Sequence, residues 1–198
     1  MRYSLLVLLS CLVLCACHKK QEPTIVEESS FPIEESAPLS EGEQLQKMYK
    51  NADSLMNIGE MDISLMQDYV HRALSYTEAN PNDSLASKYI FFASIFEMKI
   101  AGATADDILR NELYTNAINI FNSLIKQYPN FPHLDYCYWY KGTIYENMKR
   151  PNDAESEYRE LVHLFPDSEL AEGTKSYLQA QGYKKDADDL MNDIKKKQ

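Results

Sequence analysis

Two side chains with catalytic potential, His133 and Cys137, lie four residues apart in the sequence. Four residues make about one turn of an α-helix, so one helical face could present both the imidazole and the thiol. A cysteine–histidine nucleophile also needs a group that orients the histidine and donors that stabilise an oxyanion. The sequence offers neither partner. We therefore interpret Cys137 as a small core residue and expect no catalytic residues.

Recognisable motifs of enzyme chemistry are absent from the rest of the sequence. It has no P-loop, no G-x-G-x-x-G, no H-E-x-x-H and no G-x-S-x-G. His71 and His163 are single histidines among polar residues, a pattern that does not favour a metal centre. We expect no enzyme activity, no cofactor and no bound metal.

The balance of charged residues argues against a nucleic-acid partner. Lysine and arginine total 20, aspartate and glutamate total 30, and the formal net charge is −10. The clustered basic residues are Lys195, Lys196 and Lys197, close to the C-terminal end. Because phosphate backbones require a positive protein surface, we expect no nucleic acid to bind.

Residues 1–16 have the form of a secretory signal peptide. Arg2 supplies the positive end, and the mostly apolar run from Leu5 to Leu14 is short for a membrane span. The run ends in Leu14-Cys15-Ala16-Cys17, which resembles the lipobox of bacterial lipoproteins. The resemblance implies cleavage before Cys17 and acylation of its thiol and its new amino group. Cleavage before Cys11 and an uncleaved anchor helix are the alternatives.

Residues 17–40 combine the lipidated Cys17 with a predicted tether. Three prolines and two pairs of adjacent glutamates lie between His18 and Ser40. Low hydrophobicity, like charges and proline keep such a chain extended and disordered. We interpret the segment as a spacer between a membrane and a folded domain; a peptide ligand for a partner is the alternative.

Residues 41–198 are predicted to form one all-helical domain. Ser40 and Glu43 make a capping-box pattern at the start of its first helix. Apolar residues then recur at helical spacing, and proline-containing turns separate the runs. The expected helices span 41–57, from 62 or 64 to about 80, and 84–100 with Ser84 as cap, followed by one that ends before Pro129. An insertion at 102–113 should lengthen that fourth helix, which the pair Asp106-Asp107 can cap.

The stretch from Tyr138 to Pro166 carries the spacing of a known helical hairpin. It resembles one tetratricopeptide repeat, whose pattern is W-x2-L-G-x2-Y, then A-x3-F, then P. The matching positions are Tyr138, Gly142, Tyr145, Ala154, Tyr158 and Pro166. Lys141 departs from the pattern, because it stands where the repeat has leucine. The small residues Gly142 and Ala154 should let two antiparallel helices approach closely.

The resemblance extends, more weakly, to a second copy that begins at Tyr89. It implies an all-α solenoid of antiparallel helix hairpins, with about three repeats and a C-terminal capping hairpin. The aromatic-proline turns resemble those of periplasmic tetratricopeptide-repeat proteins of outer-membrane assembly and Tol-Pal type. This group implies a non-enzymatic scaffold, lipid-anchored at Cys17 in the outer membrane and facing the periplasm, whose partners are proteins of the cell envelope. A nutrient- or glycan-binding surface lipoprotein is the alternative.

The tetratricopeptide-repeat resemblance also implies a partner-binding groove. In that family, the first helix of each repeat lines the concave face. Steps of three and four residues keep one helical face, and on two helices they select the positions next to the motif. The expected groove residues are Tyr136, Trp139, Thr143 and Asn147 on one helix and Ile90, Ser94 and Glu97 on the other. Burial of Trp139 between repeats is the alternative for that residue.

Overall fold

The computed structural model describes residues 38–181. The predicted signal peptide, Cys17 and most of the predicted tether lie outside the described residues, and so does the second helix of the expected capping hairpin. The described part contains seven α-helices and no strand, which confirms the predicted all-helical class. The helices are α1 Glu41–Asn57, α2 Ile63–Ala79, α3 Ala86–Ala103, α4 Asp107–Gln127, α5 Leu134–Asn147, α6 Pro151–Leu164 and α7 Glu169–Ala180. Between residues 38 and 181, no helix is both long and apolar enough to cross a membrane.

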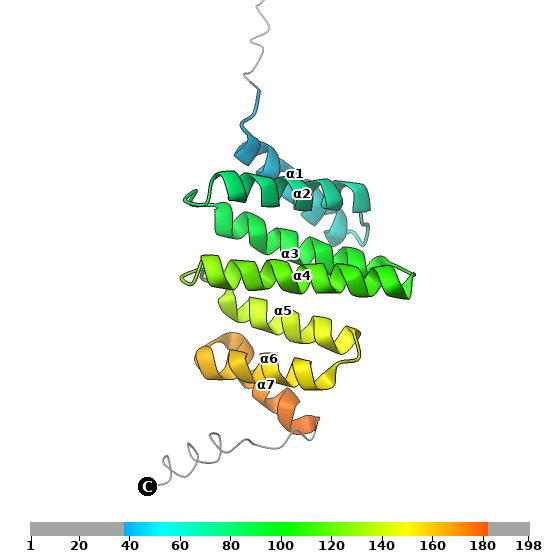
Figure 1. The fold of residues 1–198 in the computed structure, drawn as a ribbon, viewed down its shortest axis with the longest axis vertical. Helices are drawn as coiled ribbons and strands as arrows, with labels where there is room; N and C mark the ends of the chain where they lie inside the picture. Colours follow the sequence, from blue (N-terminus) through cyan, green and yellow to red (C-terminus); the bar gives the residue numbers. More distant parts are fainter. Residues whose placement is uncertain (1–37, 182–198) are drawn as a thin grey trace, which may run out of the picture. The chain divides into compact units, whose positions relative to one another are not determined.

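Consecutive helices form antiparallel pairs and stack in chain order (Figure 1). Beyond these sequential contacts, α3 also contacts α5, and α5 contacts α7. The rings of Tyr49 and Phe92 connect α1 to α3, with centroids 3.7 Å apart. The odd-numbered helices therefore share one side of the stack. The arrangement is consistent with the predicted solenoid of antiparallel helical hairpins.

Polar side chains fix where the first two helices begin, as the sequence predicts. The Ser40 hydroxyl accepts from the Glu43 backbone N–H, and the Glu43 carboxylate accepts from the Ser40 backbone N–H at 2.8 Å. These two bonds make up the capping box. Asp62 caps α2 by accepting from the Leu65 backbone N–H at 2.9 Å. Each bond satisfies a donor that the helix itself leaves unpaired.

The insertion at 102–113 lengthens a helix, as predicted. Asp106 accepts from the backbone N–H groups of residues 108 and 109, both at 2.9 Å, and so begins the 21-residue α4. The expectation that Ser84 caps α3 was wrong. The helix begins at Ala86 with Leu85 at its N-cap position and no side-chain cap bond, and in the turn before it the Asp83 carboxylate accepts from the Leu85 backbone N–H at 2.7 Å.

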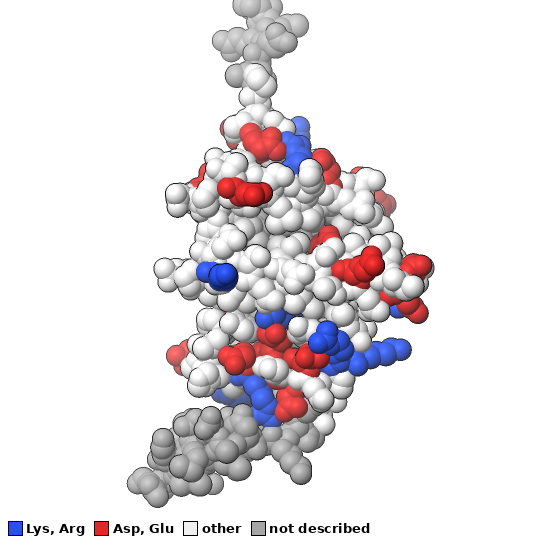
Figure 2. All heavy atoms as spheres, viewed as in Figure 1, with Lys and Arg blue, Asp and Glu red and all other residues white. Residues whose placement is uncertain are grey.

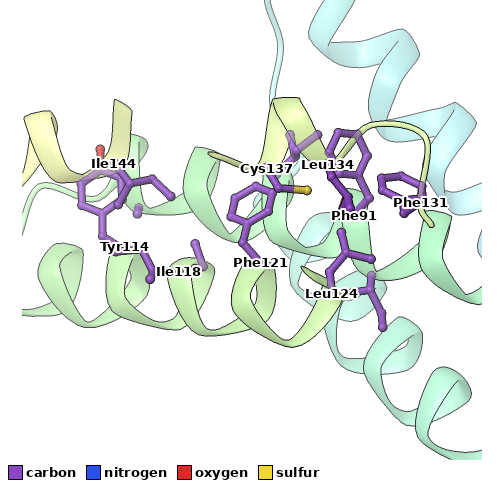
Figure 3. Close-up of a cluster of buried hydrophobic side chains, with 13 residues drawn as sticks. Phe91, Tyr114, Ile118, Phe121, Leu124, Phe131, Leu134, Cys137 and Ile144 are labelled. Carbon is purple, nitrogen blue, oxygen red and sulfur yellow. The ribbon is translucent and has the colours of Figure 1, made fainter. Parts of the chain in front are cut away.

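The third helix, α3, is the centre of the core. Eleven of its 18 residues are buried. Its Tyr89–Ala93–Phe96 face packs with side chains of α1 and α2, while Ile90 and Phe91 pack with side chains of α4 and α5. Figure 3 shows this second cluster: Phe91, Phe131, Leu134 and Cys137 lie against Phe121 and Leu124 of α4. A helix with apolar side chains all round must be covered on nearly all sides.

Helices α5 and α6 approach each other closely at Gly142. A Cβ atom on Gly142 would lie 2.7 Å from two ring carbons of Tyr158, so only glycine leaves space for that ring. Gly142 and Ala154 are both buried in this contact. The predicted close approach of the two helices is therefore confirmed, with the Tyr158 ring packed against the glycine.

Lys141, the departure from the repeat pattern, has a specific partner on α6. Its side chain is 8% exposed, and its Nζ lies 2.9 Å from Oε2 of Glu157, whose side chain is 16% exposed. The ammonium also lies 5.2 Å from the centre of the Tyr138 ring. The lysine stem fills the space of the leucine, and the buried charge at its end is paired, as buried charges must be.

Candidate protein-binding face

The two catalytic candidates are not arranged for nucleophilic chemistry. Cys137 is fully buried, and its thiol donates to the backbone carbonyl of His133 at 3.4 Å. Burial is the main cause that raises the pKa of the Cys137 thiol, to about 12, so the reactive thiolate is not formed at neutral pH. The His133 ring is exposed and lies against the rings of Phe91 and Phe131. Cys137 is a core residue, as the sequence predicts.

No group of His, Cys, Asp and Glu side chains between residues 38 and 181 has the arrangement of a metal site.

The predicted stripe on α5 does reach the surface. Tyr136, Trp139 and Thr143 are partly exposed, and Asn147 is exposed. Trp139 is neither fully exposed in a groove nor fully buried between repeats. It packs against side chains of α6 and α7 and remains partly exposed. It also meets Tyr140 edge to face, with ring centroids 5.1 Å apart. This half of the predicted groove is therefore available to a partner.

The prediction that a second stripe, on α3, is exposed was wrong. Ile90, Ser94 and Glu97 are 3%, 0% and 8% exposed. Their face of α3 turns toward α4, whose Asn116 donates to the Glu97 carboxylate at 3.4 Å. The Ala93 face, which the motif aligns with the Gly142 face of α5, lies in a cluster with side chains of α1 and α2, and Leu113 and Ile120 of α4 also pack against this cluster. The burial of Ile90, Ser94 and Glu97 contradicts the assignment of these three residues to an exposed groove.

The outward stripe of α3 consists of different residues. Lys88 and Lys99 are exposed, Phe92 is partly exposed, and Ile95 is at the limit of burial. These positions keep one helical face, because they are separated by four, three and four residues. The two lysines could have identified this face from the sequence, whereas the repeat pattern pointed to Ile90, Ser94 and Glu97. Lys88 and Lys99 are three helical turns apart, and unpaired lysines must remain in contact with water.

Six rings connect the exposed sides of α1, α3 and α5; we call them the aromatic row. The row runs from Tyr49 of α1 through Phe92 and Phe91 of α3 to Tyr140, Trp139 and Tyr136 of α5. Centroid distances are 3.7 Å for Tyr49–Phe92, 5.7 Å for Phe91–Phe92, 6.3 Å for Phe91–Tyr140, 5.1 Å for Trp139–Tyr140 and 6.4 Å for Tyr136–Tyr140. All except Phe91 are partly exposed. The row connects the partly exposed rings of α1 and α3 to those of α5 through the buried ring of Phe91.

Charges are distributed unevenly over this region. The Lys88 ammonium lies 5.9 Å from the centre of the Phe92 ring, a cation–π distance. At the α1 end of the row, burial and the nearby Asp53 carboxylate raise the pKa of the Tyr49 hydroxyl. Over α5 and α6, side chains of both signs gather, as Figure 2 shows in the lower half of the view, and several of them form ion pairs with each other.

The fold and the row define a class of protein. Antiparallel helical hairpins that stack in chain order, with one helix of each pair sharing a common side, make a helical-repeat protein. Residues 107–130 and 136–168 match the family model described as tetratricopeptide repeat. The matched residues cover α4 and nearly all of α5 and α6. Together with the fold, the match supports a tetratricopeptide-repeat protein.

The helix α3 lies outside the matched residues, which agrees with its different packing. No curated protein matches the chain.

Proposed function

We propose that this chain is a non-enzymatic scaffold that binds a segment of a protein partner on the side formed by α1, α3 and α5. The aromatic row carries this proposal, because it places partly exposed rings from three helices on the side that the odd-numbered helices share, with the buried Phe91 connecting the rings of α3 to those of α5. Tyrosine and tryptophan are enriched among the residues that dominate binding energy at protein interfaces. Tetratricopeptide repeats generally mediate protein–protein interactions, so the family match supports the same reading.

The binding surface, which we call the odd-helix face, is defined by its accessible or partly accessible residues. They are Tyr49, Lys88, Phe92, Lys99, Tyr136, Trp139, Tyr140, Thr143 and Asn147.

A photo-crosslinking amino acid at Asn147 tests this surface in cells. Asn147 is exposed at the end of α5, whereas Asn122 is exposed on the even-numbered α4 and serves as the matched control. We expect a discrete crosslinked protein from position 147 and none from position 122. The product from position 147 should decrease when Trp139→Ala is added. Equal crosslinking from both positions, or no effect of Trp139→Ala, would contradict the proposed surface.

We further propose that the scaffold is a lipoprotein of the outer membrane, facing the periplasm, with its partner in the cell envelope. The support is the sequence Leu14-Cys15-Ala16-Cys17 and its resemblance to a lipobox. Cys17→Ala should leave the protein unprocessed or release it from the membrane fraction, whereas Cys137→Ala should leave its location unchanged. Mass spectrometry that finds an unmodified Cys17 in the mature protein would refute the anchor.

A further inference from the structure

The central helix of the odd-helix face carries positive charge without acidic partners. The charged residues of α3 are Lys88, Glu97 and Lys99, and of these the glutamate is buried beneath α4. Among residues 38–181, neither lysine has an acidic side chain within ion-pair distance. The chain has a formal net charge of −10, yet within residues 38–181 these two lysines give the middle of the binding surface a local positive charge that no acidic side chain neutralises.

The acidic groups near the two outer helices are already engaged. Asp53, near Tyr49 on α1, accepts from the side-chain amide of Asn57 at 3.4 Å. Glu146 of α5 accepts from the hydroxyl of Tyr177 on α7. The carboxylates therefore have partners within the chain, while the ammonium groups of Lys88 and Lys99 have no acidic partner among the described residues.

Two apolar side chains lie between the lysines along α3. Phe92 is partly exposed and Ile95 is at the limit of burial. Eleven residues of helix separate Lys88 from Lys99, which corresponds to about 16 Å at 1.5 Å per residue. An extended peptide advances about 3.3 Å per residue, and its side chains alternate between two faces. Residues six apart in such a peptide share a face and are about 20 Å apart, a span that two flexible lysine side chains can match.

We infer that the segment bound by the odd-helix face is acidic and extended, with two carboxylates six residues apart and apolar side chains at the alternate positions between them. The segment runs along α3, its carboxylates pair with Lys88 and Lys99, and its apolar side chains meet Phe92 and Ile95. The rings of Tyr49 and Tyr140, on α1 and α5, flank this path. This inference rests on the proposed function, since it specifies the chemistry of the partner at the same surface.

Synthetic peptides with blocked ends and a fluorescent label provide the test. The acidic probe is Glu-Ser-Leu-Ser-Phe-Ser-Glu. In one control peptide lysine replaces both glutamates, in a second glutamine does, and in a third, Ser-Leu-Glu-Glu-Phe-Ser-Ser, the two glutamates are adjacent. Fluorescence polarisation measures the affinity. Emission of Trp139, the one tryptophan of the chain, reports whether the probe binds at this face.

The acidic probe should bind most tightly. Lys88→Glu with Lys99→Glu should weaken it by about three- to tenfold, as expected for two exposed ion pairs, and added salt should weaken it as well. Lys126→Glu, an exposed position on α4, should have no effect. Circular dichroism and urea unfolding of the double variant should match those of the original chain, because both lysines are exposed.

Each contrary result has a distinct meaning. Equal affinity for the glutamate, glutamine and lysine peptides would refute the acidic preference but leave the face as a binding surface. Equal affinity for the probe with adjacent glutamates would refute the spacing. If no peptide binds while crosslinking from Asn147 persists in cells, the inferred partner chemistry is wrong and the proposed function stands. If that crosslinking is also absent, both fail.

Discussion

At the scale of single residues, Gly142 has the least room for a side chain among the glycines of residues 38–181, because the Tyr158 ring packs against it. Gly142→Ala would place a methyl group 2.7 Å from two carbons of the tyrosine ring, so α5 and α6 would have to move apart. We expect the free energy of unfolding to fall by about 1–3 kcal/mol, the usual range for overpacking a core. Urea unfolding measures this change.

Gly173→Ala is the matched control, because a Cβ atom there meets no other atom within 4 Å. Gly173 lies within α7, so alanine should raise stability by roughly 0.5–1 kcal/mol through its helix propensity. Loss of stability in both variants would show that the effect comes from the helix backbone and not from the ring.

The ion pair of Lys141 and Glu157 predicts strong coupling between two positions. Lys141→Met leaves the carboxylate of Glu157 without its partner in a mostly buried place, and we expect a loss of about 3–5 kcal/mol. The double variant Lys141→Met, Glu157→Leu should recover most of it, because no unpaired charge remains. Asp153→Asn breaks an exposed pair with Arg150 and should change stability by at most about 1 kcal/mol. If the stability loss of the double variant equals the sum of the losses of the two single variants, the coupling between Lys141 and Glu157 is refuted.

Glu97 predicts a pH dependence of stability. Burial raises the pKa of its carboxyl group, against the opposing effect of the hydrogen bond from Asn116. A raised pKa in the folded state means that the protonated group contributes stability below its unfolded pKa. That contribution is lost as the pH rises through the folded value. Glu97→Gln, which stays neutral and can still accept from Asn116, should therefore stabilise the protein at neutral pH.

The gain should disappear below about pH 4, near the ordinary pKa of glutamate, where both side chains are neutral. Urea midpoints measured across this range provide the test. Glu112→Gln, at an exposed position of α4, serves as the control and should show no such dependence. A gain from Glu97→Gln that does not change with pH would refute an effect of the buried charge.

At the scale of helices, the length of α4 depends on one cap. Asp106 satisfies two backbone N–H groups, and Asp106→Ala should lower stability by about 0.5–2 kcal/mol. Ser84→Ala should have little effect, because Asp83 and not Ser84 bonds the backbone at the start of α3. Thermal unfolding of the two variants separates these roles, and equal losses would contradict the assignment of the caps.

Helix boundaries were accessible from the sequence because they depend on local chemistry. A cap residue bonds to N–H groups two or three positions away, so Ser40 identifies the start of α1 without knowledge of the fold. The same reasoning narrows the starts of α2 and α4 to Asp62 or Ser64 and to Asp106 or Asp107, and the structure selects Asp62 and Asp106. The prediction for Ser84 was wrong because several neighbouring residues at a turn can bond to the backbone at the start of a helix. The sequence offers no rule that selects Asp83 instead.

At the scale of the whole molecule, burial predicts a gradient of local stability. The central α3 has eleven buried residues, whereas α1 and α7, at the ends of the described stack, have three each. Each unit of a repeat protein contacts only its neighbours, so the terminal helices should open first. Hydrogen exchange followed by mass spectrometry should show the slowest exchange in α3. Faster exchange in α3 than in α7 would refute this order.

The sequence by itself determined the helical class, the starts of α1 and α4, the close contact at Gly142 and the exposed stripe on α5. These features follow from periodicity, from caps and from a repeat pattern whose residues lie within one hairpin. The lipid anchor and the cellular location are predictions that the described residues do not test.

Only the tertiary structure decided which side of α3 meets water. Periodicity divides a helix into faces, but α3 is apolar on several faces, and the sequence does not say which neighbour covers each one. Here side chains of α1, α2 and α4 pack against the Ala93 face, while Ile90, Ser94 and Glu97 are buried and the Glu97 carboxylate accepts from Asn116 of α4. Lys88, Phe92 and Lys99 remain accessible because the packing of α1, α2, α4 and α5 covers the other faces of α3.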